Sequence, residues 1–193
     1  MSDRGTVAFV VLAVALVTVA ALAPSLVGAR PAREIPAPTV DEDLSGTDAP
    51  GWAEAPAADI PMTAAPSGLP NAESVSVRSI HVQAARSDGR MFLRLQWEDP
   101  TENRSVSDPQ TFADAVAVQM PVNGSAQPAI AMGSPSNMVN VWYWDAATGT
   151  EELFAGGQGS TTEFGESTVE TWTEHEGSGE DGTWTVVFSR PLD

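Results

Sequence analysis

The sequence predicts an all-β domain built as an antiparallel β-sandwich, and three observations support that fold class. Met91, Leu93, Leu95 and Trp97 alternate with Phe92, Arg94 and Gln96, so one parity of residues 91–97 is entirely apolar, as in a half-buried strand. Short apolar segments recur along the chain and are separated by turns such as Ser87-Asp-Gly89 and the glycine-rich stretch 177–182. No stretch of the domain repeats its apolar residues at the 3.6-residue period of a helix.

The individual strands are expected in the following order. Apolar residues alternate from Val75 but change parity near Ser79, which indicates a strand with a bulge or bend. The turn at Ser87-Asp-Gly89 then joins that strand to residues 91–97 as a hairpin. Further strands are predicted at 116–120, at 139–144 and, after the glycine-rich turn, at 184–188.

Residues 1–29 are expected to form a membrane anchor or a signal peptide. The chain carries no charge from Gly5 to Ala29, and this run matches the roughly 20 apolar residues that a helix needs to cross a bilayer. The alternative is a secretory signal with Val27-Gly-Ala29 as its cleavage site. Both interpretations place the rest of the chain outside the cytoplasm, and an uncleaved anchor would hold it at the outer face of the cytoplasmic membrane.

Residues 30–72 are expected to form a tether rich in Pro, Ala and acidic residues, and residues 73–193 to form the sandwich domain. The eight prolines of the tether segment disfavour helices and sheet ladders. Trp52 is an exception within this segment, and it either packs on the sandwich or is an isolated aromatic of the tether.

The composition excludes several classes of function. The chain has 26 acidic residues against 9 basic ones, all of them Arg, and a formal net charge of −17. Such a surface repels nucleic acid and is typical of a protein adapted to high salt. The absence of cysteine excludes iron–sulfur clusters, thiolate metal sites and covalent c-type haem, and two histidines are too few for a multi-histidine metal site.

Four motifs occur in a characteristic order: Trp97-Glu-Asp99, Phe112-Ala-Asp114, Met132-Gly133 and Trp142-x-Trp144. Together they resemble the haem b-binding gamma subunit of molybdenum oxidoreductases of the dimethyl sulfoxide reductase type. That group includes ethylbenzene dehydrogenase, dimethyl sulfide dehydrogenase and selenate, chlorate and nitrate reductases. The resemblance implies a sandwich similar to DOMON domains and a non-enzymatic, electron-transferring subunit. The implied partners are a molybdopterin catalytic subunit, an iron–sulfur subunit and the membrane, reached through the N-terminal helix.

The resemblance also implies the site residues. The family holds its haem iron with a Met and a Lys, and Met132 matches the Met-Gly position, with Met138 as the second candidate. A thioether is a soft ligand that raises the haem potential. Trp142 and Trp144 share one face of their strand, where they line either the haem or the core.

The chain departs from the family pattern because it contains no Lys. The second ligand is therefore expected in a segment beyond Asp193, which would make this chain truncated. The substitutes are His81, in a strand, and His175, in a solvated acidic loop within residues 163–181. Asp114 is expected to cap a turn or to meet Arg94. The alternative function is a haem-free DOMON-like module that binds carbohydrate or a surface partner.

Overall fold

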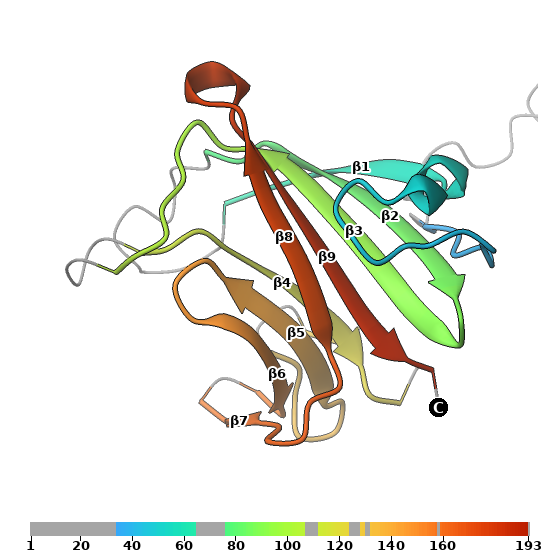
Figure 1. Cartoon of the computed structure of the whole chain (residues 1–193). Helices are drawn as coiled ribbons and strands as arrows, with labels where there is room; N and C mark the ends of the chain where they lie inside the picture. Colours follow the sequence, from blue (N-terminus) through green and yellow to red (C-terminus); the bar gives the residue numbers. More distant parts are fainter. Residues whose placement is uncertain are drawn as a thin grey trace, which may run out of the picture. The chain divides into compact units, whose positions relative to one another are not determined.

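The computed structural model describes residues 34–64, 76–106, 112–123, 128–129, 132–157 and 159–192. These residues form two antiparallel sheets that face each other (Figure 1). The strands of the larger sheet are, in spatial order, β1 (Ala57–Pro61), β2 (Ser79–Ser87), β3 (Arg90–Glu98), β9 (Thr183–Pro191) and β8 (Glu170–Glu176). Those of the smaller sheet are β4 (Ala115–Pro121), β5 (Val139–Asp145), β6 (Gly149–Ala155) and β7 (Thr161–Glu163). The described residues also include the 3₁₀ helices η1 (Pro50–Glu54) and η2 (Gly179–Asp181).

The apolar core lies between the two sheets, so the predicted antiparallel sandwich is confirmed. Its side chains come from the inner faces of both sheets: Val82, Ala84, Leu93, Leu95, Trp97, Trp184, Val186 and Phe188 from the larger, and Val116, Trp142 and Trp144 from the smaller. The alternation seen over residues 91–97 therefore corresponds to inward and outward side chains of β3.

The predicted hairpin between β2 and β3 is also confirmed. Ser87 pairs with Arg90, so the loop contains only Asp88 and Gly89. Both residues have positive φ angles, 49° and 73°, as the two central residues of a type I′ turn require. β2 itself begins at Ser79, where the apolar alternation changes parity.

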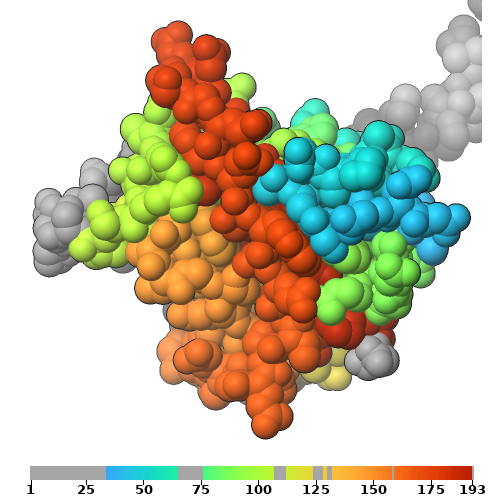
Figure 2. Space-filling model, viewed as in Figure 1, coloured from blue at the N-terminus to red at the C-terminus, as the bar shows by residue number. Residues whose placement is uncertain are grey.

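The segment before the expected domain boundary at residue 73 packs on the larger sheet. The compact unit begins at Ile35, and the described part of the expected tether contributes η1 and β1. Its side chains Val40, Leu44 and Trp52 are buried against Ala85 and other outer-face residues of the larger sheet. Figure 2 shows this segment, in blue and cyan, lying beside β8. Of the two alternatives for Trp52, packing on the sandwich is therefore confirmed, because its indole is only 4 % exposed.

Four strands occur where the sequence analysis predicted none: β1, β6, β7 and β8. In β8 the polar residues Thr171 and Thr173 occupy inward positions, so hydrophobic alternation is weak there. In β6 the inward positions include Glu152, which is 1 % exposed. Polar inward positions thus make both strands resemble solvated loops in sequence, and the expected loop over residues 163–181 is wrong where β8 forms.

The expected N-terminal helix over residues 1–29 lies outside the described residues. Within the described part of the chain, no helix has the length and apolar character needed to span a membrane.

Trp52 provides a test of how much residues 35–55 contribute to stability. Replacement of Trp52 by Ala is expected to lower the free energy of unfolding by about 3–5 kcal/mol, because a large buried aromatic is lost and a cavity remains. Arg94, whose guanidinium carbon lies 5.9 Å from the Trp52 ring centre, would lose a cation–π partner. Denaturant titration measures the change. Phe112→Ala is the control, because that ring is 74 % exposed; equal effects would contradict the packing role of Trp52.

Candidate functional site

One end of the sandwich is open between the sheets. We call it the open end: the end where β4 and β9 finish and β5 starts, at the arrowheads of β4 and β9 in Figure 1. A cleft of about 400 Å³ lies there, lined by Met91, Met120, Pro121, Val122, Asn140, Trp142, Phe154, Arg190, Pro191 and Leu192. Most of these side chains are apolar or aromatic, and Arg190 supplies the charge.

A buried polar cluster adjoins this cleft. The Glu152 carboxylate accepts a hydrogen bond from Asn140 Nδ2 at 2.9 Å and pairs with Arg190 Nη1 at 3.0 Å, both through Oε1. Asn140 Oδ1 in turn accepts from Trp142 Nε1 at 2.8 Å and from Arg190 Nη1 at 3.3 Å. Because Arg190 is on β9 and Glu152 on β6, the ion pair joins the two sheets.

Met132 lies in a fixed turn on the loop between β4 and β5. Its φ angle is +64°, in the left-handed region that residues with a side chain rarely adopt. The turn is fixed by backbone hydrogen bonds, because Gly133 N donates to Ala129 O at 3.0 Å and Gly157 N to Met132 O at 2.9 Å. The Met132 side chain packs against Val139, Val141 and Ala155 of the smaller sheet. Such strain persists only where the surroundings enforce it, and it concentrates at functional sites.

The four predicted site residues are placed on both faces of β5. Trp142 lines the cleft, and Trp144 lies in the core, with its ring centre 5.0 Å from that of Trp184. Met132 packs on the outer face of β5, opposite both tryptophans. Met138 is 43 % exposed. The structure therefore brings Trp142, but not the Met132 side chain, into the cleft.

Two other thioethers line the cleft, and the sequence analysis did not select them. Met91 lies near the start of β3 and Met120 near the end of β4. The strand alternation already directs both side chains inward, because they share parity with Leu93 and with Val116. Their position at strand ends, beside the open end, was the available signal.

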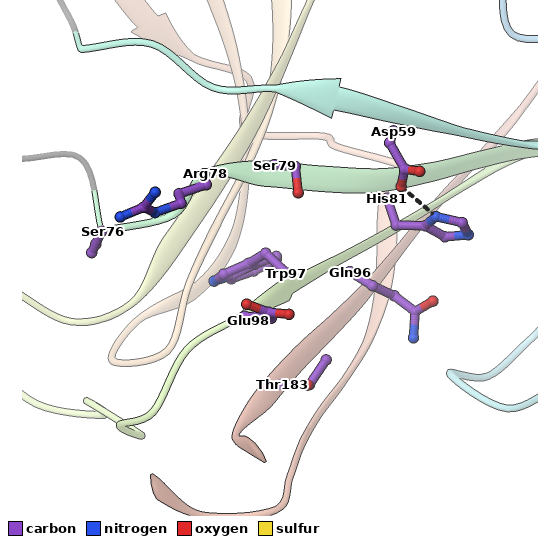
Figure 3. Close-up of a pocket in the computed structure, with 9 residues that line it drawn as sticks. All are labelled: Asp59, Ser76, Arg78, Ser79, His81, Gln96, Trp97, Glu98 and Thr183. Carbon is purple, nitrogen blue, oxygen red and sulfur yellow. Dashed lines mark hydrogen bonds and ion pairs between the residues drawn. The ribbon is translucent and has the colours of Figure 1, made fainter. Parts of the chain in front are cut away.

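His81 lies away from the open end, on the outer face of the larger sheet. Its Nδ1 lies 2.8 Å from Asp59 Oδ1, as Figure 3 shows. The pair lines a polar depression of about 340 Å³ together with Arg78, Gln96 and Glu98. His81 is therefore a strand residue, as expected.

His175 does not lie in a solvated loop, which corrects the expectation. It lies in β8, its Nε2 is 3.0 Å from Asp99 O, and its ring centre is 5.0 Å from that of Trp184. Asp114 fixes this region as well, because it accepts hydrogen bonds from Asn103 N at 2.7 Å and Trp184 Nε1 at 2.9 Å. Arg94 bonds to Gln83 and Thr47 instead of Asp114.

Two ionisable groups at the far end of β5 have shifted pKa values. Burial raises the pKa of Tyr143, and the nearby Asp145 carboxylate raises it further. Burial alone would raise the pKa of Asp145, but hydrogen bonds from Thr148 and Ala147 outweigh it and lower that pKa. Asp145 therefore stabilises the β5–β6 turn at neutral pH and loses this contribution as the pH falls through its lowered pKa.

Two facing antiparallel sheets with a cleft at one end define the class of β-sandwich domains. Within that class the chain belongs to the ethylbenzene dehydrogenase family, whose profile matches residues 49–180. The predicted family membership is thus confirmed.

Three relatives are similar to this chain over most of its length. A respiratory nitrate reductase heme subunit of Haloferax mediterranei is 47% identical over 191 residues, 98% of this chain and 68% of the relative. The chlorate reductase subunit gamma of Ideonella dechloratans is 36% identical over 78% of this chain and 62% of its own length. The dimethylsulfide dehydrogenase subunit gamma of Rhodovulum sulfidophilum is 32% identical over 73% of this chain and 56% of its own length. This chain spans between about half and two thirds of their lengths.

Gly133 provides a test of the turn at Met132. A Cβ on Gly133 would lie 2.6 Å from Asn137 O and 3.0 Å from Val139 Cγ1, so Gly133→Ala is expected to displace the turn. Gly89→Ala is the matched control, since Gly89 has the same φ of 73° and no atom within 4 Å of an added Cβ. Both variants lose about 1 kcal/mol from backbone strain. Gly133→Ala should lose further stability because of the close contacts, and thermal unfolding measures the difference. An equal loss of stability in both variants would contradict a close-packed turn.

Proposed function

We propose that this protein is an electron-transfer subunit that binds haem b at the open end of its sandwich, with Met132 as an axial ligand. Because the Met132 side chain packs on the outer face of β5, this ligation requires the loop between β4 and β5 to carry it around the start of β5 to the cleft. The observation that carries the proposal is the left-handed backbone of Met132, because the loop before β5 enforces it at a residue with a redox-relevant thioether. The haem subunit of Haloferax mediterranei, 47% identical to this chain, supports haem b as the cofactor.

The residues of the open end fit the chemistry of haem b. Its ring needs apolar walls, which Trp142, Phe154 and Met120 supply, and its propionates need a cation, which Arg190 supplies at the cleft. Haem b supplies one-electron chemistry, and the protein supplies ligation, orientation and exclusion of water.

The protein performs no substrate chemistry in this proposal. Electrons pass between an iron–sulfur subunit next to a molybdopterin catalytic subunit and a redox partner at the membrane or in solution. The proposal is supported by relatives that are gamma subunits of a chlorate reductase and a dimethylsulfide dehydrogenase. Within the described residues, no group of three or more His, Cys, Asp and Glu side chains is arranged to hold a metal ion.

Replacement of each methionine in turn tests the ligand. In the full-length protein, Met132→Ala is expected to abolish the low-spin haem spectrum or to lose the haem, because the iron loses a protein ligand. Met138→Ala is the control, since Met138 lies on the same loop with a 43 % exposed side chain. Its stability should change by at most about 0.5 kcal/mol, as for most surface substitutions. Absorption spectra of oxidised and reduced protein give the result.

Met120→Leu separates a thioether ligand in the cleft from Met132 on the loop before β5. It keeps the volume of a cleft-lining side chain and removes its sulfur. A wild-type spectrum is expected. If Met120→Leu loses the low-spin bands and Met132→Ala keeps them, the ligand lies in the cleft and the assignment of Met132 is wrong. A wild-type protein without a Soret band would instead support a haem-free binding module.

We further propose that the uncharged run from Gly5 to Ala29 holds the domain at the outer face of the cytoplasmic membrane, because its length suits a spanning helix. Membrane fractions should contain the protein, and protease added to spheroplasts should digest the domain. A soluble mature protein that begins near Arg30 would show a cleaved signal instead. Protection of the domain in intact spheroplasts, with digestion after lysis, would contradict export.

A further inference from the structure

The charge most deeply buried among the described residues lies beside the proposed haem site. Glu152 is 1 % exposed, whereas Asp145, also counted as buried, is 9 % exposed. Only Oε1 of Glu152 has hydrogen-bond partners within the described part of the chain, and Oε2 is buried without one. A carboxylate in this position is costly to desolvate, and apolar residues of similar volume are often no less stable. The structure therefore gives Glu152 no clear benefit in stability.

Arg190, the partner of Glu152, is much less buried than Glu152. The Arg190 side chain is 37% exposed and lines the cleft, whereas Glu152 lies behind it. Solvent screens the positive charge in part but hardly reaches the negative one. The pair is therefore not electrically neutral as seen from the open end, and its two charges act on a bound cofactor with different strengths.

We infer that Glu152 and Arg190 set the reduction potential of the haem, Glu152 lowering it and Arg190 raising it. This inference rests on the proposed function. Oxidised haem carries one more positive charge than reduced haem, so a nearby buried carboxylate favours the oxidised form and a nearby cation the reduced form. Asn140 is a positioning residue, because it bonds to Glu152, Arg190 and Trp142 at once.

Glu152→Gln is the variant that removes the charge with the least structural change. The Gln Oε1 keeps the two contacts of the Glu152 Oε1, and the amide replaces the buried Oε2 that has no partner. The midpoint potential is expected to rise, with a change of about tenfold in the one-electron equilibrium, which is ~59 mV. Arg190→Gln is expected to lower the potential, and Arg190→Lys to leave it close to that of the wild type.

The exposed ion pair Arg90–Glu170 supplies the matched control. Its N···O distance is 3.1 Å, close to that of the buried pair, but the Glu170 side chain is 59% exposed. Potentials are measured by spectroelectrochemical titration of the full-length haem protein at 0.2 and 2 M KCl. Because the Debye length falls to about 3 Å near 1 M salt, Glu170→Gln should give no shift at 2 M, and the Glu152→Gln shift should persist.

The outcomes separate the inference from the proposed function. A protein without haem defeats the proposed function before any potential is measured. A haem protein with a wild-type spectrum and an unchanged potential in Glu152→Gln overturns the inference alone. If Glu152→Gln does not fold, Arg190→Gln against Arg190→Lys decides, because equal potentials in these two variants overturn the inference and a lower one in Arg190→Gln supports it.

Discussion

The fold depends on how the space between the two sheets is filled, and Trp184 is the residue on which this filling depends most. Trp184 is fully buried, and its ring contacts Trp97, Trp144 and His175. The guanidinium of Arg104 lies over the same ring at 5.0 Å, and Asp114 accepts the indole hydrogen bond. One side chain thus connects strands of both sheets and the loop before β4. Aromatic packing closes this end of the sandwich, because no smaller residue would span the gap between the sheets.

The opposite end of the sandwich, the open end, contains a polar cluster between the sheets. There the inner faces carry Asn140, Glu152 and Arg190 beside Trp142, and the space between the sheets widens into the cleft. A polar cluster of this kind contributes little net stability, but breaking it leaves a buried charge without a partner, which is costly. The sandwich therefore has one end closed by aromatic packing and one end that opens into a cleft. The Met132 turn and the end of β9 both lie at the second end.

The strands with regular alternation were predictable from the sequence. The hairpin at Asp88-Gly89 and the inward Trp142 and Trp144 follow from local patterns, and so does the burial of Leu93, Leu95 and Trp97. The strands β6 and β8 were not predictable, because their inward positions carry Glu152 and His175. Such residues are accepted inside only because distant residues pair with them. Asn140 lies 12 and Arg190 38 positions from Glu152, and no local pattern reveals these pairings.

The residues of the cleft were predicted only in part. Trp142 was expected at the haem or in the core, whereas Met91, Met120 and the Glu152–Arg190 pair were not expected at a site. The Met132-Gly133 pair was selected through the family resemblance, and its role as a haem ligand stays a prediction. The face on which Met132 packs depends on the register of β5, which no motif specifies. The formal net charge of −17 is likewise a property of the whole sequence, and it does not locate a site. At molar salt those surface charges act over only about 3 Å, whereas a charge inside the sandwich keeps its range. In a protein with so acidic a surface, the buried Glu152 is therefore better placed than the many exposed carboxylates to influence a bound redox group.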